Sequence, residues 1–247
     1  MRTRTKVWIL GIGMGPQHVT PEVADALRSC DYVIAAEKSS DDGLLAARRA
    51  IAEAYGVDLV VVPDPVRDRD AVTTREQDGY GRAVHAWHEA RVGAYEQVLR
   101  ERGGTAAFLV WGDPSLYDST IRIVGSLAER LPLTYEVLPG ISAPQLLAAR
   151  HRIVLHPVGR PVHITTGRRL RADVAAGQDN LCVMLTGTLS LEGLDDWWIW
   201  WGANLGTPSE ELVAGRVSEV ADSLVQARER ARDAAGWVMD VYLLRAP

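Results

Sequence analysis

Short apolar runs alternate with longer helical patterns over the first 150 residues of this chain, and this alternation limits the folds open to it. The runs that we expect to form strands are residues 7–10, 32–36, 59–62, 106–110 and 134–138. Strands that are apolar throughout, rather than alternately apolar and polar, are typical of a parallel sheet with helices on both faces. The sequence therefore predicts an α/β domain with a mainly parallel sheet.

The pattern changes at residues 156–161, where two prolines and a glycine within five residues predict a short linker. Beyond it we expect strands at 162–165, 181–185, 197–201 and 237–244. Thr207 and Glu210 have the spacing of a helix cap, and an apolar stripe from Val217 to Ala231 predicts the helix. We therefore expect two α/β domains, residues 1–156 and 161–247, with a mixed sheet in the second.

The composition is that of an ordinary globular protein, and it argues against several classes of function. The chain is 47% hydrophobic and 24% charged, and no apolar run approaches the roughly 20 residues that span a bilayer. The net charge of −5 argues against general nucleic-acid binding, which needs a basic surface. The basic start of the chain precedes too short an apolar run for a signal peptide, so we expect a cytoplasmic protein.

Histidines and cysteines do not predict a metal site. The two cysteines are far apart and lack the spacing of metal ligands. His85 and His88 stand three residues apart on an expected helix, but no third ligand is evident. We therefore expect no bound metal. His18 and His151 lie close to glycine-rich bends and are better placed for chemistry.

Three such bends follow expected strands: residues 11–16 (Gly-Ile-Gly-Met-Gly-Pro), 112–117 (Gly-Asp-Pro-Ser-Leu-Tyr) and 139–143 (Pro-Gly-Ile-Ser-Ala). We call them the first, second and third bend. Ligands of parallel sheets bind beyond the carboxyl ends of the strands, so the bends predict a small-molecule site. The first bend is not a dinucleotide-binding fingerprint, because proline stands three places after Gly13 where a glycine is needed.

Two polar residues of the bends have both a structural and a functional interpretation. Asp113 is able to cap a helix begun by Pro114, or to bind a ligand that Gly112 allows to approach the backbone. Ser142 has capping-box spacing to Gln145, and capping does not exclude a ligand contact. For Asp113 the neighbouring Gly112 favours the ligand role, because glycine removes side-chain bulk where a ligand must touch the backbone.

Two small basic clusters stand out in this acidic chain. One contains Arg150 and Arg152, and the other contains Arg168 and Arg169. They form either a solvated face or a binding site for a molecule with several carboxylates, since arginine makes paired hydrogen bonds to carboxylate.

The three bends, in this order and spacing, resemble those of the tetrapyrrole (precorrin) methyltransferases, and the resemblance extends over nearly the whole chain. It implies two α/β domains, S-adenosylmethionine in the cleft between them, and a homodimer. The implied cofactor contacts are Gly112, Asp113, Leu116, Ser142, Ala143, Thr186 and Ala203. Among these, Asp113 would hold the methionyl amino group, while Thr186 and Ala203 would contact the adenosine.

Further segments resemble the deacetylating branch of that family: residues 15–20, 63–69, 110–120, 148–153, 164–169 and 201–208. This implies methylation of carbon 1 of precorrin-5 with loss of acetate, to give precorrin-6A in cobalamin biosynthesis. We expect the substrate to contact Gly13, Gly15, Arg150, Arg152, Arg168 and Arg169. His18, Glu37 and Tyr117 are the candidate catalytic acids and bases, because they are reactive residues at strand ends.

Two other functions remain open at this point. A related methyltransferase would act on another ring carbon or on RNA, although the acidic net charge speaks against RNA. A non-catalytic carrier would bind the cofactor or a tetrapyrrole without turnover.

Overall fold

The computed structural model describes residues 5–37, 43–65 and 77–247, with side chains from Trp87 onward in the last range. The chain divides into two compact units, Met1–Ile141 and Ser142–Pro247. The division precedes the linker expected at 156–161, because helix α5 (Ala143–His151) packs on strands of the second unit. The two units are described one after the other.

The first unit contains a five-stranded sheet in the order β3-β2-β4-β1-β5, and every described pair in it is parallel. The strands are β1 (Thr5–Gly11), β2 (Tyr32–Glu37), β3 (Asp58–Pro63), β4 (Thr105–Val110) and β5 (Leu133–Leu138). The parallel sheet predicted from the continuous apolar runs is therefore confirmed. Strand order also puts the ends of β4, β1 and β5 next to one another.

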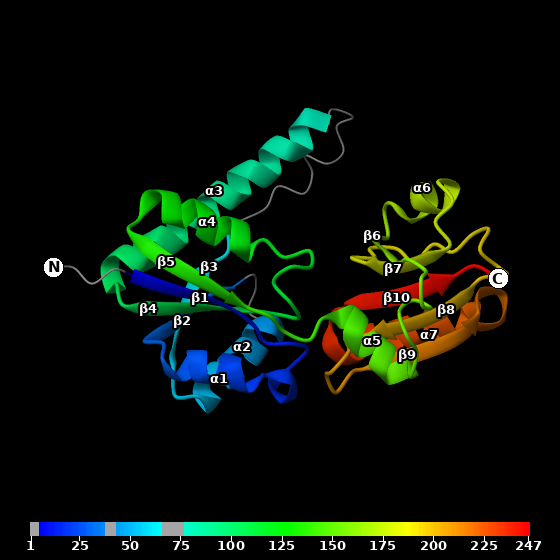
Figure 1. Cartoon of the computed structure of the whole chain (residues 1–247), viewed down its shortest axis with the longest axis horizontal. Coiled ribbons are helices and arrows are strands. Elements are labelled where there is room, and N and C mark those ends of the chain that lie inside the picture. Colours follow the sequence, from blue (N-terminus) through cyan, green and yellow to red (C-terminus); the bar gives the residue numbers. More distant parts are fainter. Residues whose placement is uncertain (1–4, 38–42, 66–76) are drawn as a thin grey trace. The chain divides into compact units, whose positions relative to one another are not determined.

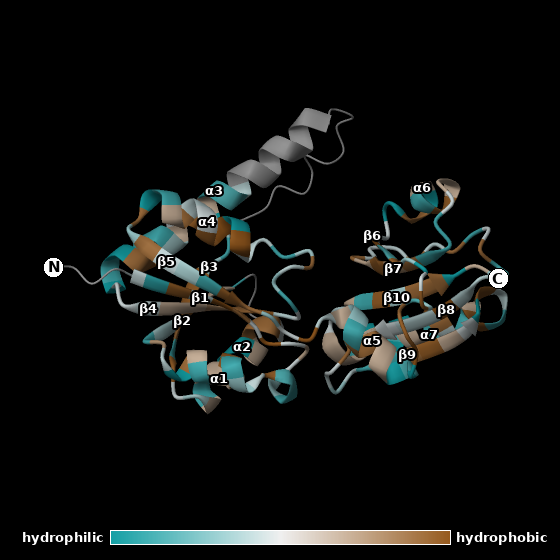
Figure 2. Ribbon diagram, viewed as in Figure 1, coloured by the Kyte–Doolittle hydropathy of each residue, from teal (hydrophilic) through white to brown (hydrophobic). Residues whose placement is uncertain are grey.

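Helices cover both faces of this sheet, as Figure 1 shows. The described helical elements are η1 (Pro16–His18), α1 (Pro21–Arg28), α2 (Gly43–Ala54), α3 (Gln77–Arg102) and α4 (Thr120–Arg130). Ile9 and Phe108 belong to one apolar cluster, with side chains of α3 and α4. Leu10 and Leu109 belong to another, with side chains of α1 and α2. Because neighbouring residues on a strand enter opposite clusters, β4 is apolar on both faces, whereas the edge strand β5 has exposed polar residues (Figure 2).

The second unit contains a mixed five-stranded sheet in the order β6-β7-β10-β8-β9, as expected. Its strands are β6 (His163–Thr166), β7 (Asn180–Met184), β8 (Trp198–Ala203), β9 (Glu211–Arg216) and β10 (Asp240–Arg245). β6 pairs with β7 in parallel, and the other described pairs of this sheet are antiparallel. Helices α6 (Leu170–Ala175) and α7 (Val217–Ala235) add side chains to one core, in which Trp201 and Tyr242 are fully buried.

One expected helix start is wrong. Residues 207–210 form the turn between β8 and β9, and helix α7 begins only at Val217. The Thr207 hydroxyl oxygen accepts a hydrogen bond from the Ser209 N–H at 3.2 Å, and Glu210 accepts one from the Gly206 N–H at 2.7 Å. Threonine and glutamate bind main-chain N–H groups in turns as they do at helix ends, so the same residues fit both structures.

The length and hydropathy of the helices bear on membrane insertion, for the part of the chain that the structure describes. Within it, no helix combines the length and the apolar character needed to cross a membrane.

Candidate functional site

The first two bends touch through their main chains. The Gly13 N–H donates to the Gly112 carbonyl oxygen at 3.2 Å, and the Gly112 N–H donates to the Gly13 oxygen at 2.7 Å. Both glycines have positive φ, 63° and 74°, a conformation that other residues adopt only with strain. The glycines of these bends therefore serve a main-chain contact between the ends of β1 and β4.

The third bend joins the same contact. A Cβ on Gly140 would lie 2.3 Å from the Gly112 carbonyl oxygen, and a Cβ on Gly11 would lie 2.4 Å from the Gly140 nitrogen. Such distances leave no room for any side chain. The structure thus brings the three bends together, although more than a hundred residues separate the first bend from the third.

Asp113 ties the second bend to the third. One carboxylate oxygen accepts hydrogen bonds from the Ser115 N–H at 2.9 Å and from the Ser115 hydroxyl. The other accepts the Gly140 N–H at 2.9 Å. The alternative in which Asp113 caps a helix begun by Pro114 is wrong, since α4 starts at Thr120 and Asp118 accepts the Thr120 N–H there.

These hydrogen bonds keep Asp113 charged. Partial burial by itself would raise the pKa of Asp113, but the hydrogen bonds from Ser115 and Gly140 outweigh burial and lower it. The second bend therefore carries a fixed negative charge at neutral pH, next to the glycine contact of the three bends. A ligand with an ammonium group and hydrogen-bonding groups fits this combination.

Ser142 has the capping role that its spacing to Gln145 predicted. Ser142 is buried and is the N-cap of helix α5. Its side chain accepts a hydrogen bond from the main chain of Gln145, and the Gln145 side chain accepts one from the main chain of Ser142. The Ser142 N–H donates to Gln145 Oε1 at 2.8 Å. Ala143 is the first helical residue.

Of the candidate acids and bases, His18 lies against the bends. Its Nδ1 accepts the Met14 N–H at 3.3 Å, and its Cβ would be 2.4 Å from a Cβ on Gly13. Because Nδ1 accepts, the proton of the neutral ring sits on Nε2. Tyr117 is in the second bend with φ 51° and is 47% exposed.

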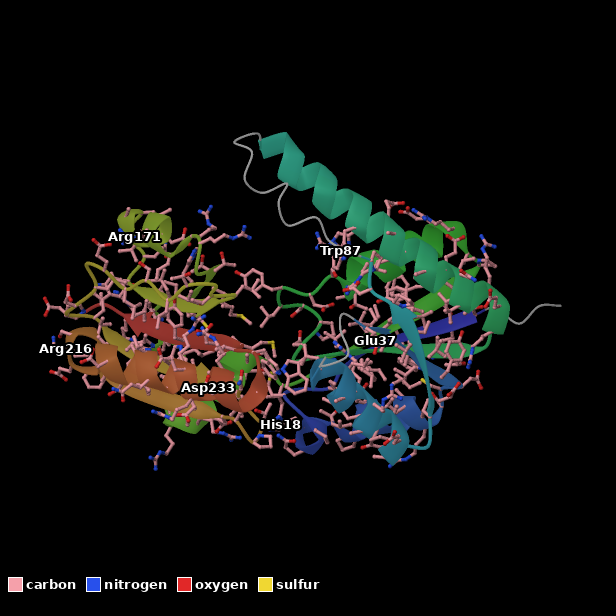
Figure 3. The ribbon with its side chains drawn as sticks, turned by 180° about the vertical axis from the view of Figure 1, so that it is seen from behind. His18, Glu37, Trp87, Arg171, Arg216 and Asp233 are labelled. Carbon is pink, nitrogen blue, oxygen red and sulfur yellow. The ribbon has the colours of Figure 1, made fainter. Side chains whose placement is uncertain are left out.

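Glu37 lies apart from His18 (Figure 3). It ends β2, which pairs with β4 only through Tyr32 and Val33 and then diverges from it. At the divergence the Arg48 Nε donates to the Leu109 carbonyl oxygen of β4 at 2.9 Å. Glu37 is exposed, and its carbonyl oxygen accepts the Asp64 N–H at 2.9 Å.

The four candidate substrate arginines lie in the second unit and are exposed. Arg150 Nε is 2.8 Å from Glu210, and Arg169 Nη2 is 3.1 Å from Asp173. Arg152 ends α5 in the left-handed conformation, with φ 56°. To bind a carboxylate of a ligand, Arg150 would have to release Glu210, and Arg169 would have to release Asp173.

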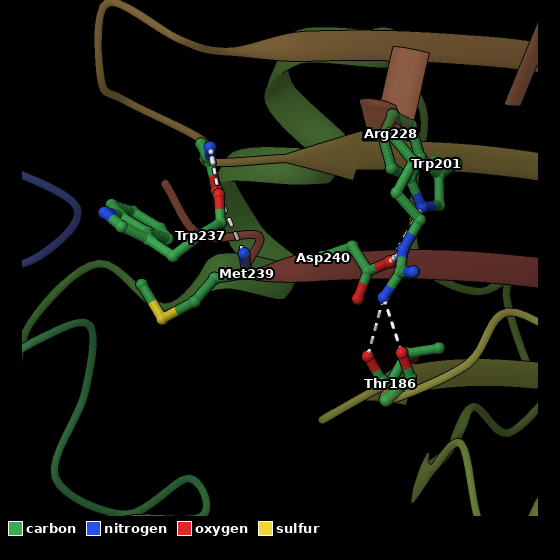
Figure 4. A network of polar contacts seen from close by, with 8 residues as sticks. Thr186, Trp201, Arg228, Trp237, Met239 and Asp240 are labelled. Atoms are coloured by element: carbon green, nitrogen blue, oxygen red, sulfur yellow. Dashed lines mark hydrogen bonds and ion pairs between the residues drawn. The ribbon is translucent and has the colours of Figure 1, made fainter. Parts of the chain in front are cut away.

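The two positions implied for adenosine share one edge of the second sheet. Thr186 follows β7 and Ala203 ends β8, and both are buried. Sequence reasoning missed the side chains that join them. Arg228 of α7 binds Asp240, the first residue of β10, and the carbonyl oxygens of Thr186 and Gly187, as the dashed lines in Figure 4 show.

A signal for Arg228 is present in the sequence. It lies four residues after Leu224 and three before Ala231, within the apolar stripe by which α7 packs on the sheet. A charged residue at a core-facing position needs a buried partner.

Metal ligands do not gather among the described residues, which contain no group of three or more His, Cys, Asp or Glu side chains able to hold an ion. The side chain of His85 and residues 66–69 of the segment 63–69 lie outside the described part of the chain.

Known proteins resemble this chain in sequence and in architecture. The family model of tetrapyrrole (corrin/porphyrin) methylases matches residues 6–221. A precorrin-6A synthase (deacetylating) from Sinorhizobium sp is 43% identical over 251 residues, covering 97% of this chain and 95% of that protein. The crystal structure of a putative cobalamin synthesis related protein (CobF) from Corynebacterium diphtheriae has a TM-score of 0.82 at 35% identity, covering 98% of this chain and 99% of that one.

A more distant structure shows the fold alone. Uroporphyrin-III C-methyltransferase from Thermus thermophilus, complexed with S-adenosylhomocysteine, has a TM-score of 0.59 at 18% identity, with coverage of 97% of this chain and 92% of that one.

Substitution of Gly140 tests the contact of the three bends. We expect G140A to lower the free energy of unfolding by about 1–3 kcal/mol or more, because its Cβ collides with main-chain atoms that cannot turn away. Urea unfolding measures the change. The control G125A, where a Cβ on helix α4 meets nothing within 4 Å, should be neutral or up to about 1 kcal/mol stabilising. Equal stability of G140A and wild type would contradict the contact.

A second prediction concerns His151, which the structure places at the end of α5 with Nε2 3.0 Å from the Trp201 carbonyl oxygen. Burial lowers its pKa from 6.5, although this carbonyl and Glu210 act in the opposite direction. The fold favours the neutral ring, so this contribution to stability is complete above pH 6.5 and is lost as the pH falls through the lowered pKa.

We therefore expect H151Q to unfold with a weaker pH dependence than wild type between about pH 7.5 and 5, when urea unfolding is followed across that range. H156Q, which changes an exposed histidine of the same unit, is the control and should keep the wild-type slope. Identical slopes for H151Q and wild type would show that His151 does not couple protonation to folding.

Proposed function

Because the chain belongs to the tetrapyrrole (corrin/porphyrin) methylase family, we propose that it methylates carbon 1 of precorrin-5 from S-adenosylmethionine and releases acetate, giving precorrin-6A. Two likenesses support this member of the family: 43% identity to a deacetylating precorrin-6A synthase, and 35% identity to CobF over nearly the full length of both chains. The pathway would then be cobalamin biosynthesis.

The observation that carries the proposal is the contact of three glycine bends around the charged carboxylate of Asp113. The methionine part of S-adenosylmethionine has an ammonium group that this carboxylate suits. We assign Gly112 and Leu116 to the same part of the cofactor, with Ser142 and Ala143. The proposed adenosine contacts are Thr186 and Ala203.

The chain's residues need to orient the reactants more than to activate them. The sulfonium of the cofactor supplies an already activated methyl group. What remains for the protein is to hold the ring carbon in line behind that methyl, and such orientation lowers barriers by up to roughly 7–11 kcal/mol. Bends fixed by main-chain contacts are suited to this task, because they have little freedom to move.

Release of acetate needs acid–base chemistry. Water adds to the acetyl carbonyl carbon, the bond from that carbon to the ring breaks, and the electron pair returns to the ring system. We propose that His18 donates a hydrogen bond to the acetyl carbonyl oxygen, because its Nε2 carries the proton of the neutral ring. Glu37 and Tyr117 are the proposed groups for accepting and returning the proton of water.

The substrate contacts remain those expected from the sequence. Gly13 and Gly15 are assigned from the family resemblance, and the arginines at 150, 152, 168 and 169 offer charge for the carboxylates of the ring. We also propose, from the family resemblance, a homodimer in the cytoplasm.

Analysis of the products tests the reaction. We expect the protein to form acetate and S-adenosylhomocysteine in equal amounts from precorrin-5 and S-adenosylmethionine, measured by mass spectrometry and acetate assay. Methyl transfer without acetate would identify a related methyltransferase of different regiospecificity. Binding of both ligands without turnover would identify a carrier.

Substitution of Asp113 tests its role in cofactor binding. We expect D113N to bind S-adenosylhomocysteine about 10- to 150-fold more weakly in calorimetry, the equivalent of one charge-assisted hydrogen bond of about 1.5–3 kcal/mol. S115A, which keeps the carboxylate and removes one of its partners, is the matched control and should lose much less affinity. Unchanged affinity of D113N would refute the assignment.

A further inference from the structure

A buried ion pair in the second unit has no place in the function proposed so far. Arg228 Nε donates to Asp240 Oδ2 at 2.9 Å, and the two side chains are only 15% and 1% exposed. Arg228 Nη2 donates further to the Thr186 oxygen at 3.1 Å and to the Gly187 oxygen at 2.8 Å. A single guanidinium therefore binds a carboxylate and two consecutive carbonyl groups of one turn.

Stability alone does not account for this pair. Asp240 Oδ1 is buried and has no hydrogen-bond partner among the described residues. Removing two charges from water costs several kcal/mol per ion, and apolar residues at such a site are often equally or more stabilising. A pair that leaves one oxygen unsatisfied is better explained by the geometry that it imposes.

That geometry concerns the turn after β7. Leu185 has φ 53°, a left-handed conformation that is unfavourable for a leucine, and it is 60% exposed. The turn is also close to the end of β6, since a Cβ on Gly167 would lie 3.2 Å from the Thr186 Cα. The two hydrogen bonds from Arg228 fix the carbonyl groups that follow this unfavourable residue.

The pair joins the two positions that we assign to adenosine. Arg228 binds Thr186 directly, while Asp240 lies opposite Ala203 in the antiparallel pairing of β10 with β8. The Trp201 indole N–H also points to Asp240 Oδ2, at 3.4 Å. Two strand ends that are not neighbours in the sheet are thus held by one cluster of side chains.

We propose that Arg228, paired with Asp240, is a positioning residue for the cofactor: it holds the Thr186–Gly187 turn and the end of β8 in the arrangement that receives the adenosine of S-adenosylmethionine. The inference rests on the proposed function, because it takes its ligand from there. Arg228 does not touch the cofactor in this scheme. It acts through the two carbonyl groups that it binds and through Asp240.

The test compares R228M and R228K with R230M. Arg230 lies two residues away on α7 in an exposed pair with Glu211, so R230M removes a salt bridge of the same helix outside the cluster. Calorimetry with S-adenosylhomocysteine gives the affinity, and thermal unfolding gives the stability. We expect at least tenfold weaker binding for R228M, partial recovery for R228K, and wild-type binding for R230M.

Kinetics separate positioning from general damage to the fold. With precorrin-5 as substrate, R228M should raise the KM for S-adenosylmethionine about tenfold, with kcat at saturating cofactor and the KM for precorrin-5 within about twofold of wild type. Equal losses for both substrates, or affinity for S-adenosylhomocysteine within twofold of wild type, would overturn the proposal.

A second variant covers the case in which R228M does not fold. The double substitution R228M/D240L replaces the ion pair by apolar side chains, which buried sites often tolerate. If it folds and binds S-adenosylhomocysteine like wild type, the positioning role is wrong. A wild-type protein that binds S-adenosylhomocysteine but releases no acetate refutes the proposed reaction alone, whereas one that does not bind it refutes both.

Discussion

Main-chain contact between glycines is the constraint on which the first unit depends. Gly13 and Gly112 exchange two hydrogen bonds, and Gly140 lies so close to Gly112 that a Cβ on Gly140 would collide with the Gly112 carbonyl oxygen. This contact is possible because the strand order places β4, β1 and β5 side by side. Once the bends touch, the Gly140 N–H is within reach of Asp113, and the carboxylate is fixed in place.

Much of this arrangement is predictable from the sequence, for physical reasons that differ between elements. The strands of the first unit are predictable because helices cover both faces of the sheet, which makes most residues of β1, β2 and β4 apolar. The bends were found because glycine is needed where backbones touch. Their meeting at one edge follows from the rule that parallel strands end together.

What could not be predicted depends on contacts between distant residues. Capping signals at Pro114 and Thr207 suggested helix starts, yet these residues serve a loop and a strand–strand turn, because local hydrogen-bonding rules are the same in both. The partner of Asp113 is 27 residues away, and the Thr186 carbonyl bound by Arg228 is 42 residues away. An arginine in an apolar helix stripe indicates that a buried partner exists, but the sequence does not identify that partner.

The two units fix their strand ends by different physical means, and this difference assigns different roles to two carboxylates. Asp113 needs only N–H and hydroxyl donors, and these lower its pKa, so its charge is available to a ligand. Burial raises the pKa of Asp240 even though Arg228 opposes it, and its Oδ2 is already bound by that guanidinium. A cationic ligand therefore has one suitable partner of the two. This contrast supports the proposal that Asp113 binds the cofactor while Asp240 helps to hold a turn in position.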